Sequence, residues 1–161
     1  MARVPGRLVG ERSALYRDEM SGAQATNVLL IEDDFVDIKA VRRAFQKFQF
    51  SAQLHCVSNG LQALETLRGT PDGVPLPRPY LILMDLNLPG MNGLKFLTEL
   101  RGDPVLRDAI VFVLTTSSDE TDISAAYRAG ISGYFVKSNL SADLGELVTL
   151  LRVYADCARF P

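Results

Sequence analysis

The sequence predicts an α/β fold, in which a doubly wound, five-stranded parallel sheet of order 2-1-3-4-5 is flanked by five helices. Five short apolar runs occur along the chain, each of the kind found in strands that are buried on both faces of a sheet. Each run is followed by a segment whose apolar residues recur every three or four positions, as on one face of a helix. Because strands and helices alternate, crossover connections place the helices on both faces of a parallel sheet.

The composition is that of a globular domain with its own core. Of the 161 residues, 47% are hydrophobic and 22% are charged. The formal net charge of −2 offers no general attraction to nucleic acid or to an anionic membrane, so neither is expected as a partner. No stretch approaches the roughly 18 consecutive apolar residues of a membrane helix, and the N-terminus lacks the apolar core of a secretory signal. We therefore expect a cytoplasmic protein.

The chain divides into two parts. Residues 1–26 show no clear period and are predicted to form a flexible N-terminal extension, whereas residues 27–158 are predicted to form the domain. The last predicted helix reaches the end of the chain, so no output domain is expected. The two cysteines, Cys56 and Cys157, have neither metal-type spacing nor a disulfide framework, and they are expected to be reduced.

The first half of the domain is predicted to contain three strands and two helices. Residues 27–32 and 52–57 are the first two strands, and the helix between them places four residues on one face: Ile38, Val41, Phe45 and Phe48. Asn59, with Gln62 three residues later, resembles a capping box and predicts the start of the next helix. The loop of residues 69–79 contains four prolines and leads into the third strand.

The second half repeats this alternation. Asn92 is predicted to cap a helix that extends to about Arg101, and residues 109–115 are rich in β-branched side chains, as in a strand. Ser117 and Glu120 form a second capping box, and the helix that they begin is predicted to end at Gly130 with three residues inward: Ile123, Ala126 and Tyr127.

The last strand and helix complete the domain. Residues 132–137 are the fifth strand, and the final helix is predicted over about residues 140–157. Its apolar face is formed by Leu140, Leu144, Leu147, Leu151, Tyr154 and Ala158. A second apolar stripe of Leu150, Val153 and Cys157 is not needed by the core, and it predicts a homodimer through the C-terminal helical face.

Polar side chains end four of the five predicted strands. Glu32, Asp33 and Asp34 follow the first strand, and Asp85 ends the third in the stretch LILMDLNLPG. In the predicted strand order these two strands are neighbours, so their carboxylates converge. Two carboxylates about 4 Å apart repel by about 4 kcal/mol at an effective dielectric of about 20. Mg²⁺, which prefers oxygen ligands, would remove this repulsion.

Thr115 and Lys137 end the fourth and fifth strands at the same edge. A hydroxyl, an ammonium group and a metal position beside Asp85 would suit a nucleophilic carboxylate that accepts a phosphoryl group. Each residue alone has a plainer explanation. A lysine at a strand end is usually solvated, a threonine there is usually local structure, and an acidic pair is often a helix cap. The combination is more specific than any member of it.

Four segments resemble the receiver domain of two-component response regulators, the CheY-like family: VLLIEDD, LILMDLNLPGMNG, VFVLTTS and AYRAGISGYFVKS. The resemblance covers about residues 27–158. It implies that Glu32 and Asp33 hold Mg²⁺, together with Asp85 and the backbone carbonyl of Asn87. Asp85 would accept the phosphoryl group. The switch and phosphate-binding positions would be those of Thr115, Lys137 and Tyr134, with Asp34, Thr116 and Ser117 near the site.

The resemblance also implies partners. A sensor histidine kinase would supply the phosphoryl group, and an unidentified downstream protein would read the switch. The chain resembles single-domain regulators paired with phytochrome-type kinases in the phrases RPYLILMDLN and VFVLTTS, in its proline-rich loop and in that no output domain is expected. Two positions depart from the family pattern: Ser138 stands where proline is common, and Thr116 stands where a smaller residue is common.

Three other functions compete with a phosphorylation switch. A phosphatase with an aspartyl intermediate needs a second carboxylate two residues after the nucleophile, where this chain has Asn87, so an enzyme is not expected. A flavin carrier is disfavoured because three consecutive acidic residues would repel the flavin phosphate. A receiver-like interaction module that is never phosphorylated remains open, because of Thr116 and Ser138. His55 lies on a strand remote from the acidic edge and is expected to be structural.

Overall fold

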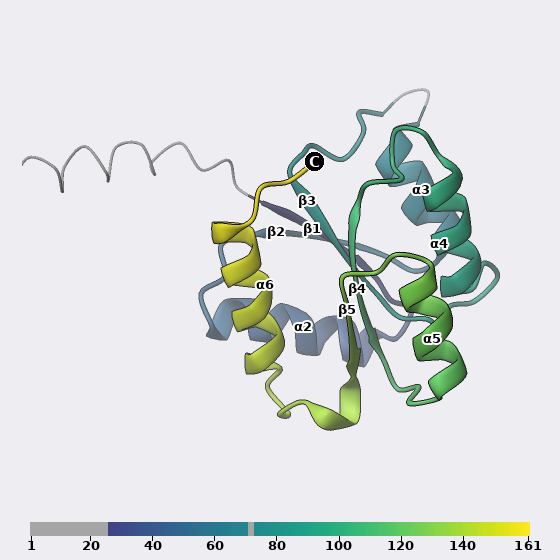
Figure 1. Ribbon diagram of the computed structural model, residues 1–161. Coiled ribbons are helices and arrows are strands. Elements are labelled where there is room, and N and C mark those ends of the chain that lie inside the picture. The colour runs from purple at the N-terminus through teal and green to yellow at the C-terminus, as the bar shows by residue number, and fades with distance from the viewer. Residues whose placement is uncertain (1–25, 71–72) are drawn as a thin grey trace, which may run out of the picture.

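The predicted parallel sheet is present in the computed structural model, which describes residues 26–70 and 73–161. Its strand order is β2-β1-β3-β4-β5, and every pairing is parallel, as predicted (Figure 1). The strands are β1 (Asn27–Ile31), β2 (Gln53–Val57), β3 (Tyr80–Met84), β4 (Ile110–Thr115) and β5 (Gly133–Val136). The helices are α2 (Phe35–Lys47), α3 (Gly60–Arg68), α4 (Gly93–Gly102), α5 (Glu120–Arg128) and α6 (Gly145–Cys157).

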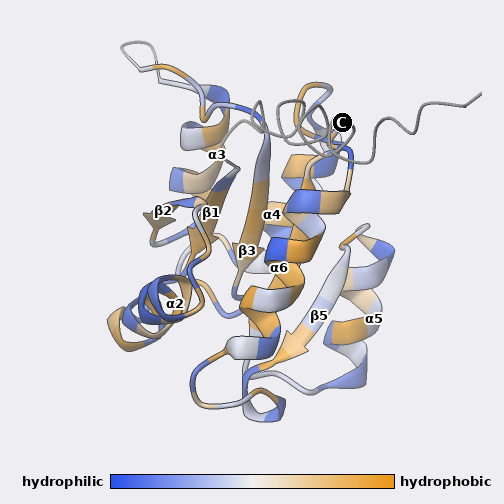
Figure 2. Cartoon of the chain, turned by 90° about the vertical axis from the view of Figure 1, so that its left-hand side faces the viewer, coloured by the Kyte–Doolittle hydropathy of each residue, from blue (hydrophilic) through white to orange (hydrophobic). Residues whose placement is uncertain are grey.

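The helices cover the two faces of the sheet unequally. On one face, α2 and α6 pack against β1, β3 and β4 through residues such as Val41, Phe45 and Leu151. On the other face, α3, α4 and α5 pack on the same strands through Leu64, Phe96 and Ala126. Figure 2 shows apolar residues along the central strands and alternating apolar and polar residues along α6. Every residue of β1 and β3 is buried, as expected for strands between two helical layers.

Helix caps set the positions of the loops at the carboxyl edge. Asn59 accepts a hydrogen bond from the amide of Gln62, and Asn92 accepts one from the amide of Lys95, so both predicted caps are confirmed. The predicted end of α5 is also confirmed, because Gly130 follows it with a φ of 76°, in the left-handed region that favours glycine.

Three local predictions in the second half are wrong. The cap of α5 is Asp119 and not Ser117, since the Asp119 side chain accepts from the amide of Thr121. Tyr127 is 51% exposed and does not face the core. The final helix begins at Gly145 and not at 140, because Leu144 has a φ of 56°, which helix geometry does not allow.

The segment that precedes α6 still contributes to the core. A short 3₁₀ turn, Lys137–Asn139, follows β5 directly. Leu140 and Leu144 pack against the apolar cluster beneath α6, so their burial was predicted correctly although their conformation was not. None of the helices in residues 26–70 and 73–161 has the length and apolarity needed to span a membrane. The predicted extension lies, apart from Thr26, outside the described residues.

Candidate functional site at the carboxyl edge of the sheet

Strand register brings the acidic residues of β1 and β3 together. Ile31 is paired with Met84, so the next residues, Glu32 and Asp85, follow neighbouring strands at one edge. The amide of Asp85 donates to the carbonyl of Ile31 at 3.0 Å, which continues the ladder by one step. Both side chains are buried, with Glu32 3% and Asp85 7% exposed. Two adjacent buried carboxylates are costly unless other groups compensate their charge.

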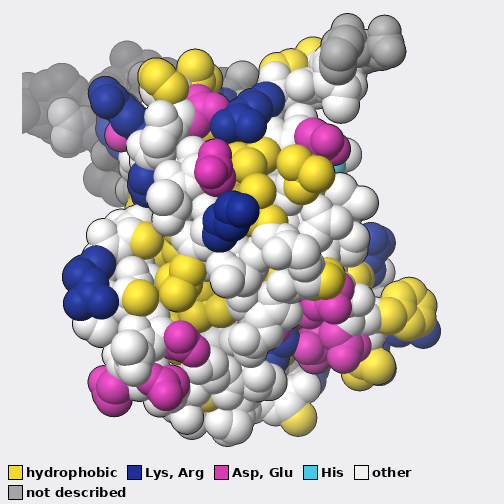
Figure 3. Space-filling model, turned by 90° about the vertical axis from the view of Figure 1, so that its right-hand side faces the viewer, with side chains coloured by type: hydrophobic (Ala, Val, Ile, Leu, Met, Phe, Trp, Pro, Cys, Tyr) yellow, Lys and Arg dark blue, Asp and Glu magenta, His cyan; other side chains and the backbone are white. Residues whose placement is uncertain are grey.

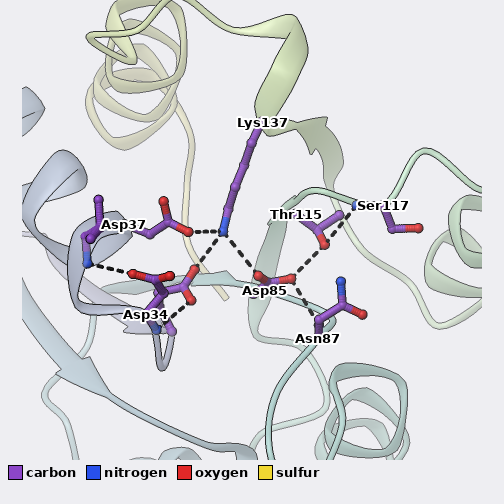
Figure 4. Close-up of polar contacts among 9 residues, drawn as sticks. Asp34, Asp37, Asp85, Asn87, Thr115, Ser117 and Lys137 are labelled. Atoms are coloured by element: carbon purple, nitrogen blue, oxygen red, sulfur yellow. Dashed lines mark hydrogen bonds and ion pairs between the residues drawn. The ribbon is translucent and has the colours of Figure 1, made fainter.

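Asp85 is compensated by donors on both carboxylate oxygens (Figure 4). Its Oδ1 accepts from the hydroxyl of Thr115 at 2.6 Å and from the amide of Asn87 at 3.0 Å. Its Oδ2 accepts from the ammonium group of Lys137 at 3.1 Å. Thr115 is the last residue of β4 and is fully buried, so its hydroxyl is fixed by the sheet itself. The predicted meeting of Asp85, Thr115 and Lys137 is therefore present in the structure.

Lys137 contacts three carboxylates at once. Besides Asp85, its Nζ donates to Glu32 at 3.0 Å and to Asp37 at 2.6 Å. Asp37 lies in the first turn of α2 and is not among the site residues predicted from the sequence. The signal that could have found it is its position, since the first turn of the helix after β1 begins at the same edge of the sheet. An ammonium group has three donors, and here all three are used.

The pKa values follow from burial and from these bonds. Burial raises the pKa of Asp85, but the hydrogen bonds from Thr115 and Asn87, with the charge of Lys137, outweigh burial and hold it below its usual range. Burial also raises the pKa of Glu32, and its bonds only partly offset this. Burial lowers the pKa of Lys137, but its bonds to Asp37 and Glu32 dominate, so the pKa is raised. At neutral pH, Asp85 is thus a carboxylate beside an ammonium group.

The other predicted site residues make no hydrogen bond to Asp85 within the described part of the chain. Asp33 and Thr116 are exposed. Asp34 caps α2 by accepting from the amide of Val36 at 2.7 Å, so for this residue the plainer explanation of an acidic pair is correct. His55 accepts or donates a hydrogen bond with Asn27 at 3.0 Å, which fits its expected structural role.

Ser117 and Tyr134 connect the site to α5. The hydroxyl of Tyr134 donates to the carbonyl of Ser117 at 3.0 Å, and burial raises the pKa of that hydroxyl. The hydroxyl of Ser117 donates to Asp122 of α5 at 2.6 Å. The loop between β4 and α5 is therefore held through both the carbonyl and the hydroxyl of Ser117.

A buried aspartate at the end of β3, with a lysine and a threonine from β5 and β4, agrees with the resemblance found in the sequence. A family model described as response regulator receiver domain matches residues 28–149. The chain belongs to this receiver family. The match covers β1 from Val28 onward, the other four strands, helices α2 to α5 and the first five residues of α6.

Known receivers resemble the chain along most of their length. Response regulator Rcp1 from a Synechocystis strain is 36% identical over 121 residues, which is 75% of this chain and 82% of that protein. The crystal structure of the phosphorylated cyanobacterial phytochrome response regulator RcpA is 31% identical, with a TM-score of 0.76, and the match covers 86% of this chain and 99% of that one. The Mn²⁺-bound form of Rcp1 is 32% identical, with a TM-score of 0.73 and the same coverage.

The donors of this receiver have the chemistry that a hard divalent cation requires. Glu32 and Asp85 offer carboxylate oxygens on adjacent strands, and with Asp37 they outnumber the single ammonium group of Lys137. Within residues 26–70 and 73–161, however, no three His, Cys, Asp or Glu side chains are grouped so that they could hold a metal ion. Lys137 joins Glu32 to Asp85 instead, so a cation bound to these two carboxylates would compete with Lys137.

Proposed function

We propose that this receiver is a phosphorylation switch that accepts a phosphoryl group on Asp85 from a sensor histidine kinase. The observation that carries the proposal is the environment of Asp85. It is an ionised carboxylate at the edge of the sheet, with a lysine on one oxygen and a threonine on the other.

The transfer would form one bond and break one. An oxygen of Asp85 attacks phosphorus, the P–N bond of the kinase phosphohistidine breaks, and the released imidazole nitrogen keeps the electron pair and takes up a proton. The lowered pKa of Asp85 keeps its carboxylate ionised and therefore nucleophilic. Lys137 lies 3.1 Å from this carboxylate and would offset the charge on the transferred oxygens, while Thr115 would donate to one of them.

A divalent cation, Mg²⁺, is proposed as the cofactor of this reaction. Glu32, Asp33, Asp85 and the backbone carbonyl of Asn87 would hold the ion, which when bound would neutralise charge developing on the phosphoryl oxygens. The Mn²⁺-bound form of the relative Rcp1 supports a divalent cation in this family.

The switch would act through the loop that follows β4. Thr115 touches Asp85 on one side, and Tyr134 touches the carbonyl of Ser117 on the other. A phosphoryl group that binds one arrangement of this loop more strongly than the other, by a few kcal/mol, would shift the population toward that arrangement. The surface formed by α5 and β5 would then change its affinity for a downstream protein.

The phosphoryl donor is proposed to be a kinase of the phytochrome type. The support is the relation to RcpA, a phytochrome response regulator that is 31% identical. We infer that the protein is a substrate of the kinase and a switch, and not an enzyme that turns over a separate substrate. The cytoplasmic location expected from the sequence stays a prediction.

An intact-mass measurement tests the acceptor. The protein is incubated with acetyl phosphate and Mg²⁺, beside an Asp85→Asn variant and an Asp108→Asn control that removes an exposed carboxylate elsewhere. One added phosphoryl group is expected in the wild type and in the control. None is expected in Asp85→Asn, because the amide is not a nucleophile, nor in samples treated with a chelator.

Two outcomes would contradict the proposal. An adduct that persists in Asp85→Asn places the acceptor elsewhere. No adduct in any sample, together with no shift of the melting temperature on adding beryllofluoride and Mg²⁺, would support a receiver-like interaction module that is never phosphorylated.

A further inference from the structure

Ser117 lies between the phosphoryl site and α5, and each of its polar groups has a partner. Its carbonyl accepts from Tyr134 at 3.0 Å, and its hydroxyl donates to Asp122 at 2.6 Å. The same hydroxyl accepts from the amide of Asp119 at 3.3 Å, which joins it to the residue that caps α5. In Figure 4 the side chain of Ser117 points away from Asp85, so it is not placed to touch a group bound there.

The hydrogen bond between Ser117 and Asp122 is of the strong kind. An ionised acceptor shortens and strengthens a hydroxyl bond, and 2.6 Å is in the range of such charge-assisted pairs. Both side chains are half-buried, so water competes less for them than it would on an open surface. Asp122 lies in the first turn of α5 and is therefore fixed by the helix.

This bond is present in the arrangement of the loop in which Thr115 contacts Asp85. Ser117 is two residues after Thr115, and its amide donates to the Thr115 hydroxyl at 3.4 Å, which links the two contacts directly. Interactions that favour the same arrangement of a segment strengthen one another, and the effect is reciprocal.

We propose that Asp122 is a positioning residue, which holds Ser117 so that the loop presents the Thr115 hydroxyl to the group bound at Asp85. The inference rests on the proposed function and adds a connection that reaches α5. It predicts that occupation of the phosphoryl site strengthens the Ser117–Asp122 bond, and that loss of this bond weakens binding at Asp85, which neither the Ser117 nor the Asp122 side chain contacts.

The test is a double-mutant cycle with beryllofluoride as the phosphoryl analogue, in the presence of Mg²⁺, followed by fluorine NMR. Ser117→Ala and Asp122→Ala are each expected to weaken binding about three- to tenfold, as for the loss of one charge-assisted hydrogen bond at a partly exposed position. The double variant is expected to bind no more weakly than either single variant, since both remove the same bond. Ser117→Thr, which keeps the hydroxyl, is expected to bind like the wild type.

Controls separate this role from a general loss of stability. Glu120→Gln removes an exposed carboxylate from the same turn of α5 and is expected to leave binding unchanged. Asp122→Asn, which keeps an acceptor, covers the case in which Asp122→Ala does not fold. Hydrogen exchange gives a second measurement: beryllofluoride is expected to slow exchange in the first turn of α5 in the wild type but not in Ser117→Ala.

The outcomes distinguish the two proposals. Wild-type protein that does not bind beryllofluoride overturns the proposed function and this inference with it. Wild-type protein that binds, beside single variants that bind equally well or whose effects add in the double variant, overturns the role of Asp122 alone.

Discussion

Charge balance is the main constraint on individual residues at this site. Three carboxylates, those of Glu32, Asp37 and Asp85, share the single ammonium group of Lys137. Their environments separate their chemical behaviour, as the pKa of Asp85 is lowered while that of Glu32 is raised. Asp85 accepts three hydrogen bonds, which outweigh its burial, whereas Glu32 accepts two, from the amide of Asp34 and from Lys137, which do not. The proposed nucleophile, Asp85, is thus the carboxylate whose charge is best stabilised by hydrogen bonds from the protein.

This asymmetry predicts how stability depends on pH at Glu32. A raised pKa means that the folded protein binds the Glu32 proton more tightly than the unfolded chain does. The free energy of unfolding therefore falls as the pH rises from about 4.5, the ordinary value, through the raised pKa. The Glu32→Gln variant has no carboxyl group at this position, so it does not lose stability in this way as the pH rises. In chelator, its melting temperature at pH 7 is expected to exceed that of the wild type by a few degrees, and the gain is expected to vanish at pH 4.

Thermal unfolding at the two pH values measures this difference. Glu99→Gln, which removes an exposed carboxylate on α4, serves as the control and is expected to melt like the wild type. A Glu32→Gln protein that is less stable than the wild type at pH 7 would mean that the ion pair with Lys137 outweighs the cost of burying Glu32.

At the scale of the elements, the loops at the two ends of α4 fix that helix in place. At its carboxyl end, the guanidinium group of Arg101 donates to four backbone carbonyls, those of Arg107, Ala109, Ala129 and Gly130. These bonds join the end of α4 to the end of α5 and to the loop before β4. At its amino end, the amide of Gly93 donates to the carbonyl of Leu86 at 2.9 Å, which holds the helix against the loop after Asp85.

Gly93 leaves no room for a side chain. A Cβ at this position would lie 2.7 Å from the Cα of Leu86 and 2.8 Å from Cε of Met84, and the backbone atom cannot move without displacing the loop. Gly93→Ala is therefore expected to lower the free energy of unfolding by about 1–3 kcal/mol, as overpacking of a buried position does. Denaturant titration measures this change.

Gly102, at the other end of the same helix, is the matched control. A Cβ there would meet nothing within 4 Å, so Gly102→Ala is expected to be neutral or to stabilise by up to about 1 kcal/mol. Equal stabilities of the two variants would contradict the close approach of α4 to Leu86.

At the scale of the whole molecule, two surfaces differ in character. The face on which α4 and α5 lie mixes acidic and basic side chains among apolar ones (Figure 3). Along α6, by contrast, an apolar groove of about 980 Å³ is lined by residues that include Leu150, Val153, Tyr154 and Cys157. Leu150 is 39% and Val153 52% exposed, so the second apolar stripe predicted for this helix faces outward.

We propose that a second copy of the chain covers the groove along α6, as the second apolar stripe of this helix predicts. Sedimentation at micromolar concentrations is expected to show a monomer–dimer equilibrium for the wild type. Val153→Glu is expected to shift this equilibrium to the monomer, because dimer formation would bury an unpaired carboxylate, which is costly. Val105→Glu, at a position that is 71% exposed elsewhere on the surface, is the control and is expected to dimerise normally. A wild type that remains monomeric at these concentrations contradicts the proposal.

The sequence by itself determined the elements and the edge at which the site lies. Apolar runs in β1 and β3, with the caps Asn59 and Asn92, are local patterns that need no knowledge of distant residues. Once the strands are parallel and β1 adjoins β3, Glu32, Asp85, Thr115 and Lys137 must share one edge. The strand order was predicted from the alternation of strands and helices along the chain, which is typical of doubly wound folds, and the structure confirms this order.

Only the tertiary structure decided which side chains meet within that edge. Asp37 and Lys137 are 100 residues apart, and their contact depends on how α2 and the end of β5 are placed across the sheet. The start of α6 could not be predicted either, because Leu140 and Leu144 keep helical spacing while a left-handed residue delays the helix to Gly145. The spacing of apolar residues along the chain predicts on which face of a helix or strand a residue lies. It does not report the backbone conformation, or the reach of a long side chain, that brings a residue to its partner.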